Sequence, residues 1–496
     1  MLLSVGIDIG SAGTQVVFSR VRMQRQSAEL ASRYVAVERE TLYQSPIALT
    51  PYLSDTRIDE RAVGDIVDRA YAAAGVHPDD VDAGAVILTG EALRRENAQA
   101  IAEVIAELGG EFVCATAGHH MESMLAAYGS GCAMESHERD LRLLNVDIGG
   151  GTTKLAIVED GKVMSTAALH IGGRLLVVSD DGRITRLDPA GRRLAAHAGF
   201  DWELGARPDP QSLDRVAAWM ADALICALTT EPVPPEVGGL YLTEPLERPR
   251  ELGGIMFSGG VGEYVYGRED RDFGDLGRRL GHALRARIDG GSLPWPLLQA
   301  AQCIRATALG ASEYTVQLSG NTVFVSDPAQ LLPRRNLMVL RPEYYLAAEI
   351  APEPLAASIR RHFARFDLVE GEAEVALAFR WRGAPSWERL AAFGRGLVAG
   401  MAATLQRKMP LFVILDGDVA QSLGALLKEE LAVESEILVI DGVELWDFDY
   451  VDLGRIRMPS HTVPVTIKSL VFQQDPRRPH VHAHGAAAGD RTDGRG

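Results

Sequence analysis

Short apolar runs alternate with amphipathic stretches along the first part of the chain. Residues 4–9 and 14–18 are apolar and rich in β-branched side chains, and the glycine-containing turn between them predicts a β-hairpin. Apolar side chains recur at helical spacing within 59–74, and 97–108 is a second predicted helix that ends at two glycines. The continuous apolar run at 85–89 indicates a buried strand.

This opening pattern occurs twice. The segment from Asp8 to Val16 aligns without a gap on the segment from Asp147 to Leu155, and the Asp, Ile, Gly and second Thr positions coincide. An apolar strand precedes each copy and another follows it. Because the two copies begin at residues 8 and 147, the repeated unit is a domain and not a short solenoid module.

The residue types in the two turns suit phosphate binding. Glycines let several backbone N–H groups approach one anion, and hydroxyl groups add donors. An Asp at the strand end can hold Mg²⁺, usually through water, or orient an attacking water. We therefore take Asp8 and Asp147 as candidate catalytic and Mg²⁺-binding residues. The candidate phosphate-binding residues are Gly10, Ser11, Ala12, Gly13 and Thr14 in the first turn, and Gly149, Gly150, Gly151, Thr152 and Thr153 in the second.

A third element follows a strand predicted at 254–257. Its glycines would let a nucleoside lie flat against the backbone, and its candidate nucleotide-binding residues are Ser258, Gly259, Gly260, Val261 and Glu263. Glu91, at the end of the strand 85–89, is a further candidate for positioning water or Mg²⁺, although an exposed loop carboxylate explains it equally well. No G-x-x-x-x-G-K-[ST] motif occurs, so a P-loop is not indicated.

In this order the three elements resemble the phosphate-1, phosphate-2 and adenosine motifs of the actin/Hsp70/sugar-kinase superfamily. The resemblance implies an α/β, two-lobed actin-like (ribonuclease H-like) ATPase fold with ATP/ADP and Mg²⁺ as ligands. Residues 117–129 and 306–311 resemble its connecting helices. We expect a first lobe at 1–140, a second lobe at 141–326 with an inserted loop near 199–250, an additional C-terminal α/β region at 327–474 that begins with a loop at 327–342, and a disordered tail at 475–496.

Composition limits the class of partner and the cellular location that we expect. The 496 residues carry a formal charge of −17, which does not favour sequence-independent binding to nucleic acid or attachment to an anionic membrane. The four cysteines are scattered and indicate reduced thiols. The first residues lack the basic and apolar regions of a signal peptide, and no run of 18 apolar residues occurs, so we expect a cytoplasmic protein.

Nearly the whole chain, to about residue 472, resembles the ethanolamine ammonia-lyase reactivating factors. Outside the phosphate turns, the resemblance rests on Thr89-Gly90-Glu91, on Gly172-Gly173-Arg174-Leu175-Leu176 and on the terminal Val463-Pro464-Val465-Thr466-Ile467-Lys468-Ser469-Leu470. One departure is clear. The first turn reads Ser11-Ala12-Gly13 where that family typically has a threonine run, so the second copy is the complete phosphate loop.

The resemblance implies an ATP-dependent factor that binds ethanolamine ammonia-lyase holding damaged cobalamin and, with Mg²⁺, promotes its release so that adenosylcobalamin can rebind. ATP would bridge the two lobes, and hydrolysis would change their angle. The C-terminal region is then a candidate for partner recognition. A homodimer and association with a bacterial microcompartment remain open. A small-molecule kinase or an actin-like filament protein would share the core, whereas an activator with an iron–sulfur cluster would need a cysteine pair that the sequence lacks.

Overall fold

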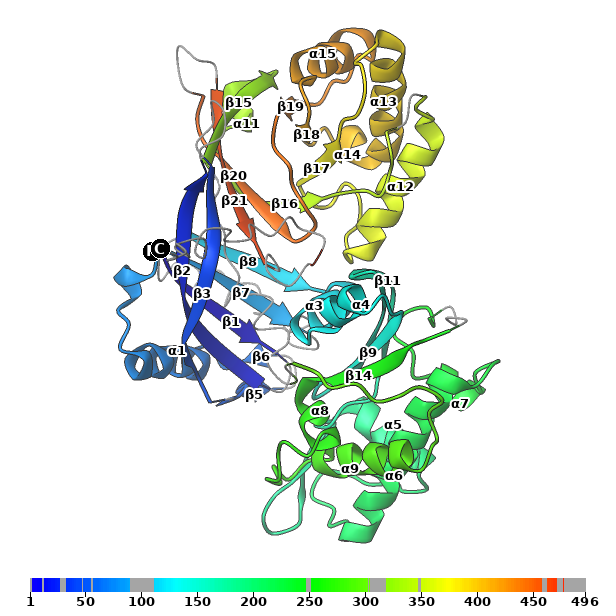
Figure 1. Ribbon diagram of the computed structural model, residues 1–496. Helices are drawn as coiled ribbons and strands as arrows, with labels where there is room; N and C mark the ends of the chain where they lie inside the picture. Colours follow the sequence, from blue (N-terminus) through cyan, green and yellow to red (C-terminus); the bar gives the residue numbers. More distant parts are fainter. Residues whose placement is uncertain are drawn as a thin grey trace, which may run out of the picture.

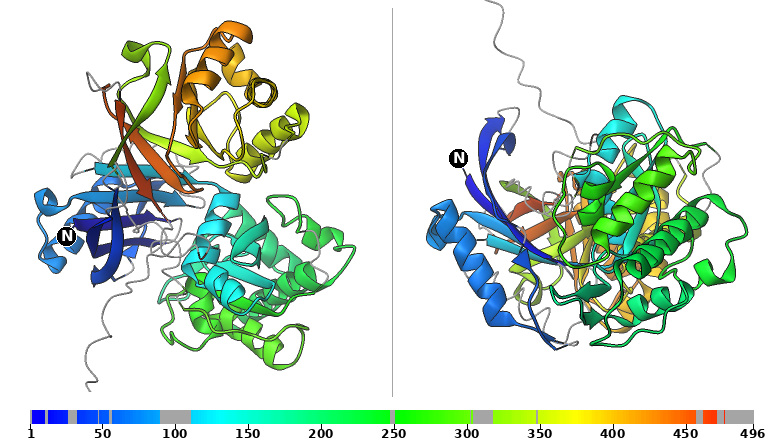
Figure 2. Two further views of the ribbon diagram at one scale, coloured as in Figure 1. Left: turned by 45° about the horizontal axis from the view of Figure 1, so that its top comes forward. Right: turned by 90° about the horizontal axis from the view of Figure 1, so that it is seen from below.

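The chain folds into two lobes that lie side by side and a C-terminal region that packs against both (Figures 1 and 2). The computed structural model describes residues 2–10, 13–26, 33–46, 48–54, 57–89, 111–246, 251–301, 303, 318–346, 349–456, 462–470 and 476. The predicted helices at 97–108 and 306–311 and almost all of the predicted disordered tail lie outside these residues.

The first lobe is built on a sheet in the order β3-β2-β1-β7-β8, with β4 paired to β2. β1 is antiparallel to β2 and parallel to β7. α1 begins at the N-cap Asp59, whose carboxylate accepts the Ala62 N–H, and ends at the left-handed Gly75. The bounds are β1 (Leu2–Ile9), β2 (Gly13–Gln26), β3 (Arg33–Gln44), β4 (Ala48–Leu49), β5 (Tyr52–Ser54), β6 (Arg57–Ile58), α1 (Glu60–Ala74), a 3₁₀ turn (Pro78–Asp80), β7 (Ala83–Thr89) and β8 (Glu111–Ala117).

The second lobe repeats this arrangement in a sheet of order β11-β10-β9-β14, where β9 is antiparallel to β10 and parallel to β14. The shared order and directions confirm the predicted two-lobed, ribonuclease H-like fold. α3 (His119–Gly129) and α4 (Cys132–Glu138) pack on this sheet, although the expected boundary at residue 140 placed them in the first lobe. The other bounds are β9 (Leu143–Ile148), β10 (Thr153–Glu159), β11 (Lys162–Leu169), β12 (Leu176–Val178), β13 (Ile184–Leu187), α5 (Pro189–His197), α6 (Pro210–Thr229), α7 (Pro235–Gly238), β14 (Gly254–Ser258), α8 (Gly259–Val265) and α9 (Gly277–Asp289).

The C-terminal region is a closed barrel in the order β15-β19-β18-β17-β16-β20-β21. Four neighbouring strands, β16 to β19, are parallel, and the helices that connect them pack on the outside of the barrel (Figure 1). The bounds are β15 (Leu318–Val325), α11 (Pro328–Leu331), β16 (Arg334–Leu340), α12 (Pro352–Arg365), β17 (Val375–Arg380), α13 (Trp387–Gly400), α14 (Ala402–Gln406), β18 (Leu411–Asp416), α15 (Ala420–Ala425), a π-helical turn (Leu426–Glu430), β19 (Ile437–Ile440), β20 (Asp449–Leu453) and β21 (Thr462–Ser469).

Two predicted loops are wrong. The stretch 327–342 contains α11 and β16, because the apolar end of β16 packs inside the barrel between β17 and β20. The stretch 199–250 contains the 20-residue α6, which starts at the N-cap Asp209 and buries one face against α5 and α9. In both stretches, apolar positions between the prolines and polar residues are buried by tertiary packing.

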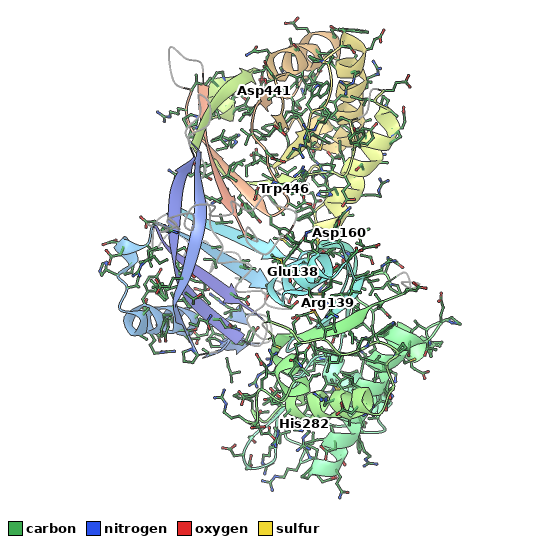
Figure 3. All side chains as sticks on the ribbon, viewed as in Figure 1. Glu138, Arg139, Asp160, His282, Asp441 and Trp446 are labelled. Carbon is green, nitrogen blue, oxygen red and sulfur yellow. The ribbon has the colours of Figure 1, made fainter. Side chains whose placement is uncertain are left out.

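One hydrophobic core runs from the second lobe into the C-terminal region. Met121, Leu125 and Tyr128 of α3 belong to the same buried cluster as Phe363 and Phe448. At its edge Glu343 forms ion pairs with Lys162 and with Arg365, both at 2.7 Å. Asp160, labelled in Figure 3, lies at this boundary in the turn between β10 and β11. The barrel is therefore packed onto the lobe that carries the second turn.

The terminal segment singled out above contributes β21 and places Lys468 inside the barrel region. Its side chain is 2% exposed and pairs with Asp452 at 2.6 Å.

We predict that Asp452→Ala lowers the free energy of unfolding by about 3–5 kcal/mol, because it leaves a buried ammonium without its carboxylate. Urea unfolding of the full chain measures this. Glu434→Ala is the matched control, since it breaks the exposed Lys408–Glu434 pair and should leave the unfolding midpoint near wild type. Equal shifts in the two variants would contradict the prediction.

Candidate functional site

The two repeated turns have the same backbone construction. The Gly10 N–H donates to the Gly13 carbonyl at 2.9 Å, and the Gly149 N–H donates to the Thr152 carbonyl at 3.0 Å. In the strand registers Asp8 lies opposite Gln15 and Asp147 opposite Lys154. The alignment made from sequence is therefore also a structural equivalence. Ser11 and Ala12 of the first turn lie outside the described residues.

The threonines of the two turns are held by the protein. The Thr14 hydroxyl is 3.0 Å from that of Thr50, which also donates to the Gly10 carbonyl at 2.7 Å. The Thr153 hydroxyl donates to the Ile171 carbonyl at 2.8 Å. Both threonine side chains are fully buried. These contacts brace each turn from behind, which leaves the backbone N–H groups as the natural ligands for phosphate.

The second turn is also supported by the segment 172–174. The Gly173 N–H donates to the Gly149 carbonyl at 2.9 Å, and the Arg174 N–H donates to the Gly150 carbonyl at 2.7 Å. Gly172 lies so close that a Cβ there would overlap the Gly150 carbonyl. The Gly-Gly-Arg segment quoted above thus supports the second turn, the candidate phosphate loop.

The third element meets the end of β9. Gly259 has φ +77°, and a Cβ at this position would overlap the Ile148 carbonyl group, so a glycine is required. Val261 is 3% exposed and its side chain packs in the core of the second lobe, whereas Gly260 and Glu263 are half-buried. Any contact of Val261 with nucleotide would therefore be made by its backbone.

The structure brings Asp8 and Asp147 together from the two lobes, close enough for the charge of Asp147 to act on Asp8. They are 7% and 6% exposed. Thr89 donates to Asp8 at 3.3 Å, and Ser258 donates to Asp147 at 2.7 Å. Of the Thr-Gly-Glu motif only Thr89 is described, and Glu91 lies outside the described residues.

A hydrogen-bond chain fixes the Asp147 carboxylate. Ser258 accepts from the Asn145 amide at 3.2 Å, and Asn145 accepts from the Ser130 hydroxyl at 2.9 Å. Asn145 and Ser130 are almost fully buried. Because every member is oriented by the next, the carboxylate has one defined position.

Two further charged residues of this site were missed by the sequence analysis. Glu122 on α3 and Lys154 on β10 form an ion pair of 2.7 Å, with side chains 11% and 2% exposed. The ammonium of Lys154 also donates to the Thr152 hydroxyl. The available signal was a single charge within each of two otherwise apolar segments, since such a charge is rarely buried without a partner or a function.

The four charges do not balance. Burial, and then the nearby Glu122 and Asp147 carboxylates, raise the pKa of Asp8 to about 7. Burial likewise raises the pKa of Asp147 to about 6, against the hydrogen bond from Ser258 and the charge of Lys154. Three carboxylates surround one ammonium, so the ionised cluster carries excess negative charge. A divalent cation at this place would relieve it.

The described residues contain no group of three His, Cys, Asp or Glu side chains placed to bind a metal ion directly. A cation here would therefore be held largely through water and phosphate oxygens, which is the usual mode for Mg²⁺. The adjacent His119 and His120 are half-buried, and the His120 ring is 2.7 Å from the Thr166 hydroxyl. Cys132, Cys226 and Cys303 are free thiols.

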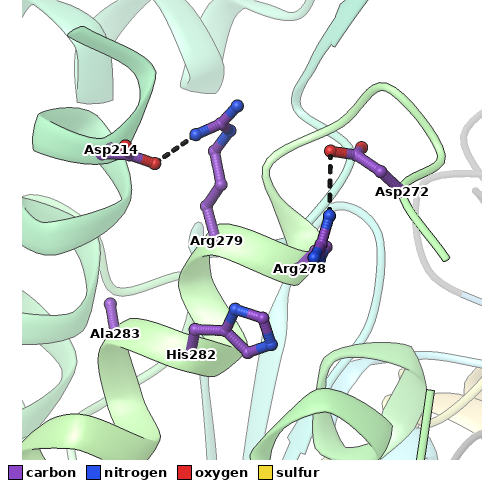
Figure 4. A pocket seen from close by; sticks show the side chains of 6 residues that line it. All are labelled: Asp214, Asp272, Arg278, Arg279, His282 and Ala283. Atoms are coloured by element: carbon purple, nitrogen blue, oxygen red, sulfur yellow. Dashed lines mark hydrogen bonds and ion pairs between the residues drawn. The ribbon is translucent and has the colours of Figure 1, made fainter. Parts of the chain in front are cut away.

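A separate open hollow of about 480 Å³ lies between α6 and α9 (Figure 4). Its lining is Asp214, Asp272, Arg278, Arg279, His282 and Ala283. Arg279 pairs with Asp214, and Arg278 lies 3.8 Å from Asp272, so the arginines are already matched by carboxylates. None of the predicted site residues lines this hollow.

The chain is similar to proteins of known family along nearly its whole length. The sequence profile of the family described as ethanolamine utilisation protein EutA matches residues 1–473. The chain is 34% identical over 482 residues to the ethanolamine ammonia-lyase reactivase EutA of Salmonella typhimurium, covering 95% of this chain and 98% of the relative. The corresponding protein of Escherichia coli K12 matches with the same identity and coverage.

Solved structures are more distant. Ethanolamine utilization protein EutJ from Carboxydothermus hydrogenoformans is 17% identical, with a TM-score of 0.33 over 63% of this chain and 89% of that one. MreB 5 of Spiroplasma citri bound to AMPPNP is 16% identical, with a TM-score of 0.31 over 62% of this chain and 94% of that one.

In the described part of the chain, no helix is long and apolar enough to span a membrane.

The contact between Gly172 and the second turn generates a prediction. Gly172→Ala should displace the Gly150 carbonyl and weaken Mg²⁺–ATP binding by roughly 10- to 100-fold, as expected for about 1–3 kcal/mol of overpacking. Titration with a fluorescent ATP analogue measures the dissociation constant. Gly64→Ala is the matched control, because a Cβ there meets nothing within 4 Å. Unchanged affinity in folded Gly172→Ala would contradict the assignment of this turn.

Proposed function

This chain belongs to the ethanolamine utilisation protein EutA family, and we propose that it is an ATP-dependent reactivating factor of ethanolamine ammonia-lyase. In this role it binds lyase that holds damaged cobalamin and uses ATP and Mg²⁺ to promote release of that cobalamin. Adenosylcobalamin then rebinds. Family membership over residues 1–473 supports the partner, and the paired Asp8 and Asp147 support the use of nucleotide.

The use of nucleotide is supported by one observation above all: the two equivalent turns bring Asp8 and Asp147 close to each other. Each turn follows a strand whose last residue but one is a buried aspartate, and the two aspartates come from different lobes. A polyphosphate bound by both turns would tie the lobes together. Loss of its terminal phosphate would remove contacts from one lobe, so hydrolysis would change the angle between them.

Within this site each side chain has a distinct task. The backbone N–H groups of the two turns hold phosphate oxygens, and Ser258 holds Asp147 in position. Glu122 is placed to accept a proton from, and so orient, the attacking water. Lys154, which pairs with Glu122, neutralises part of the negative charge that a bound nucleotide adds. Mg²⁺, when bound, would be held through water by Asp8 and Asp147 and would neutralise charge that develops on the phosphate oxygens.

The alternatives share the core but not the family. A small-molecule kinase would need an acceptor in the same cleft, and a filament protein would need a polymerisation surface. Neither accounts for identity that extends along 95% of the chain, including the C-terminal barrel. The net charge of −17 fits a protein partner better than nucleic acid. Homodimerisation and association with a microcompartment stay predictions.

Reactivation of the lyase tests the proposal. Ethanolamine ammonia-lyase inactivated with cyanocobalamin is incubated with the purified chain, adenosylcobalamin, Mg²⁺ and ATP, and recovery of lyase activity is measured. We expect recovery only when all components are present, because cobalamin exchange requires both nucleotide and metal. EDTA and a non-hydrolysable ATP analogue serve as controls. If lyase activity stays at the inactivated level while the chain binds ATP, the proposal fails.

The excess negative charge generates a second prediction. Asp8→Asn and Asp147→Asn should each abolish Mg²⁺-dependent ATP hydrolysis, yet leave the chain as stable as wild type or more stable at neutral pH. The reason is that each raised pKa marks a carboxylate whose charged form is disfavoured in the folded site. The amide keeps the acceptor for Thr89 or Ser258. Phosphate release and thermal unfolding are measured on the same samples, and retained hydrolysis in both variants would exclude the paired site.

A further inference from the structure

The helix that carries Glu122 begins without a cap of its own. α3 starts after Gly118, which has extended φ and ψ of −67° and −175° and no side chain to accept a hydrogen bond. A helix N-terminus exposes several N–H groups, and Ser, Thr, Asp or Asn at the N-cap normally satisfies them. At α3 the local residue cannot do this.

The missing cap comes from the C-terminal region. One carboxylate oxygen of Asp367 accepts the N–H groups of His120 at 2.9 Å and of Met121 at 3.0 Å. These are the N–H groups that an N-cap side chain would normally bind. Asp367 occupies the space that a side chain on Gly118 would need, because a Cβ there would lie 2.6 Å from its Oδ2 atom. The glycine and the distant aspartate are therefore complementary.

The end of another helix fixes the position of Asp367. It follows α12 in the left-handed conformation, with φ +57°, and the Leu368 N–H closes that helix end on the Phe363 carbonyl at 3.0 Å. The adjacent Phe366 packs on Phe448, with ring centroids 5.3 Å apart. A movement of α12 must therefore move the capping carboxylate.

Both ends of α3 depend on the same region. At its far end Tyr128 packs edge-on against Phe448, with centroids 5.9 Å apart. Between these ends Glu122 lies one residue beyond the capped Met121 and pairs with Lys154 in the nucleotide site. Two contacts therefore fix the position of α3 and of its Glu122 carboxylate. One is the contact of His120 with Thr166 of β11, and the other is the packing against the C-terminal region.

We propose that Asp367 is a positioning residue for nucleotide hydrolysis, and that its bond to the first turn of α3 transmits the state of the C-terminal barrel region to Glu122. The proposal rests on the function proposed above. A partner that shifts α12 would loosen or tighten the first turn of α3, and hydrolysis would respond without any contact between the partner and the nucleotide.

Three variants of the full chain separate this role from simple helix stability. Asp367→Gly removes the carboxylate and suits the left-handed backbone, so the end of α12 is kept. Asp367→Asn retains an acceptor and is the conservative control. In the double variant Gly118→Ser with Asp367→Gly, the space vacated by Asp367 admits a local serine cap, so α3 is capped but no longer linked to the C-terminal region.

Amide hydrogen exchange at His120 and Met121 and steady-state hydrolysis are measured for each variant. In Asp367→Gly we expect exchange at these amides to quicken about tenfold, as loss of a cap predicts. We expect kcat to fall about tenfold with KM for ATP little changed, because Glu122 acts on the attacking water and not on nucleotide binding. Asp367→Asn should stay near wild type in both measurements.

The double variant decides between a cap and a link. We expect it to regain slow exchange and near wild-type hydrolysis, while lyase reactivation remains about tenfold below wild type because the coupling is absent. Unchanged exchange and kcat in Asp367→Gly would overturn the positioning role, and full recovery of reactivation in the double variant would overturn the link. If the wild-type chain does not hydrolyse ATP, the proposed function is wrong. Amide exchange at His120 and Met121 still tests, independently of hydrolysis, whether Asp367 caps α3.

Discussion

Three carboxylates converge on one buried ammonium where the two lobes meet. Asp8 and Asp147 come from the ends of equivalent strands, and Glu122 and Lys154 come from the helix and strand beside them. Buried charges of one sign are unfavourable unless something neutralises them, and Lys154 alone does not suffice. The fold brings these groups together because the repeated strands, with their turns, face each other. The proposed Mg²⁺–nucleotide ligand would relieve this excess of negative charge.

The surroundings of this cluster are arranged to keep it in place. The threonines of the turns bond to neighbouring backbone and side chains, and a chain from Ser130 through Asn145 and Ser258 orients Asp147. The segment at Gly172 supports the second turn at a distance that only glycine allows. Such support is what a site needs if small changes in bound phosphate are to become movements of whole lobes.

The C-terminal barrel is integrated with this site. It shares a hydrophobic core with α3, and its Asp367 supplies the cap that Gly118 cannot. Nucleotide chemistry by itself requires none of the barrel. In the proposal above, these contacts are the route by which a partner and the nucleotide site affect each other. Lys468, in the terminal segment that is specific to the family resemblance, pairs with Asp452 of the neighbouring strand β20, and this buried pair contributes to the integrity of the barrel.

The sequence alone determined the two turns and the strands around them, because glycine, threonine and aspartate at fixed positions between apolar runs act through local backbone geometry. That was enough for the fold, and it singled out Asp8, Asp147 and Ser258, which the structure brings into one buried cluster. It was not enough for Glu122 and Lys154, which pair with each other across 32 residues of the chain. Nor was it enough for Asp367, which caps a helix 247 residues away. It also failed at β16 and α6, where burial in tertiary structure outweighs local proline and polar residues. Only the tertiary structure decided these, because an ion pair or a cap between distant segments exists only after both segments have packed.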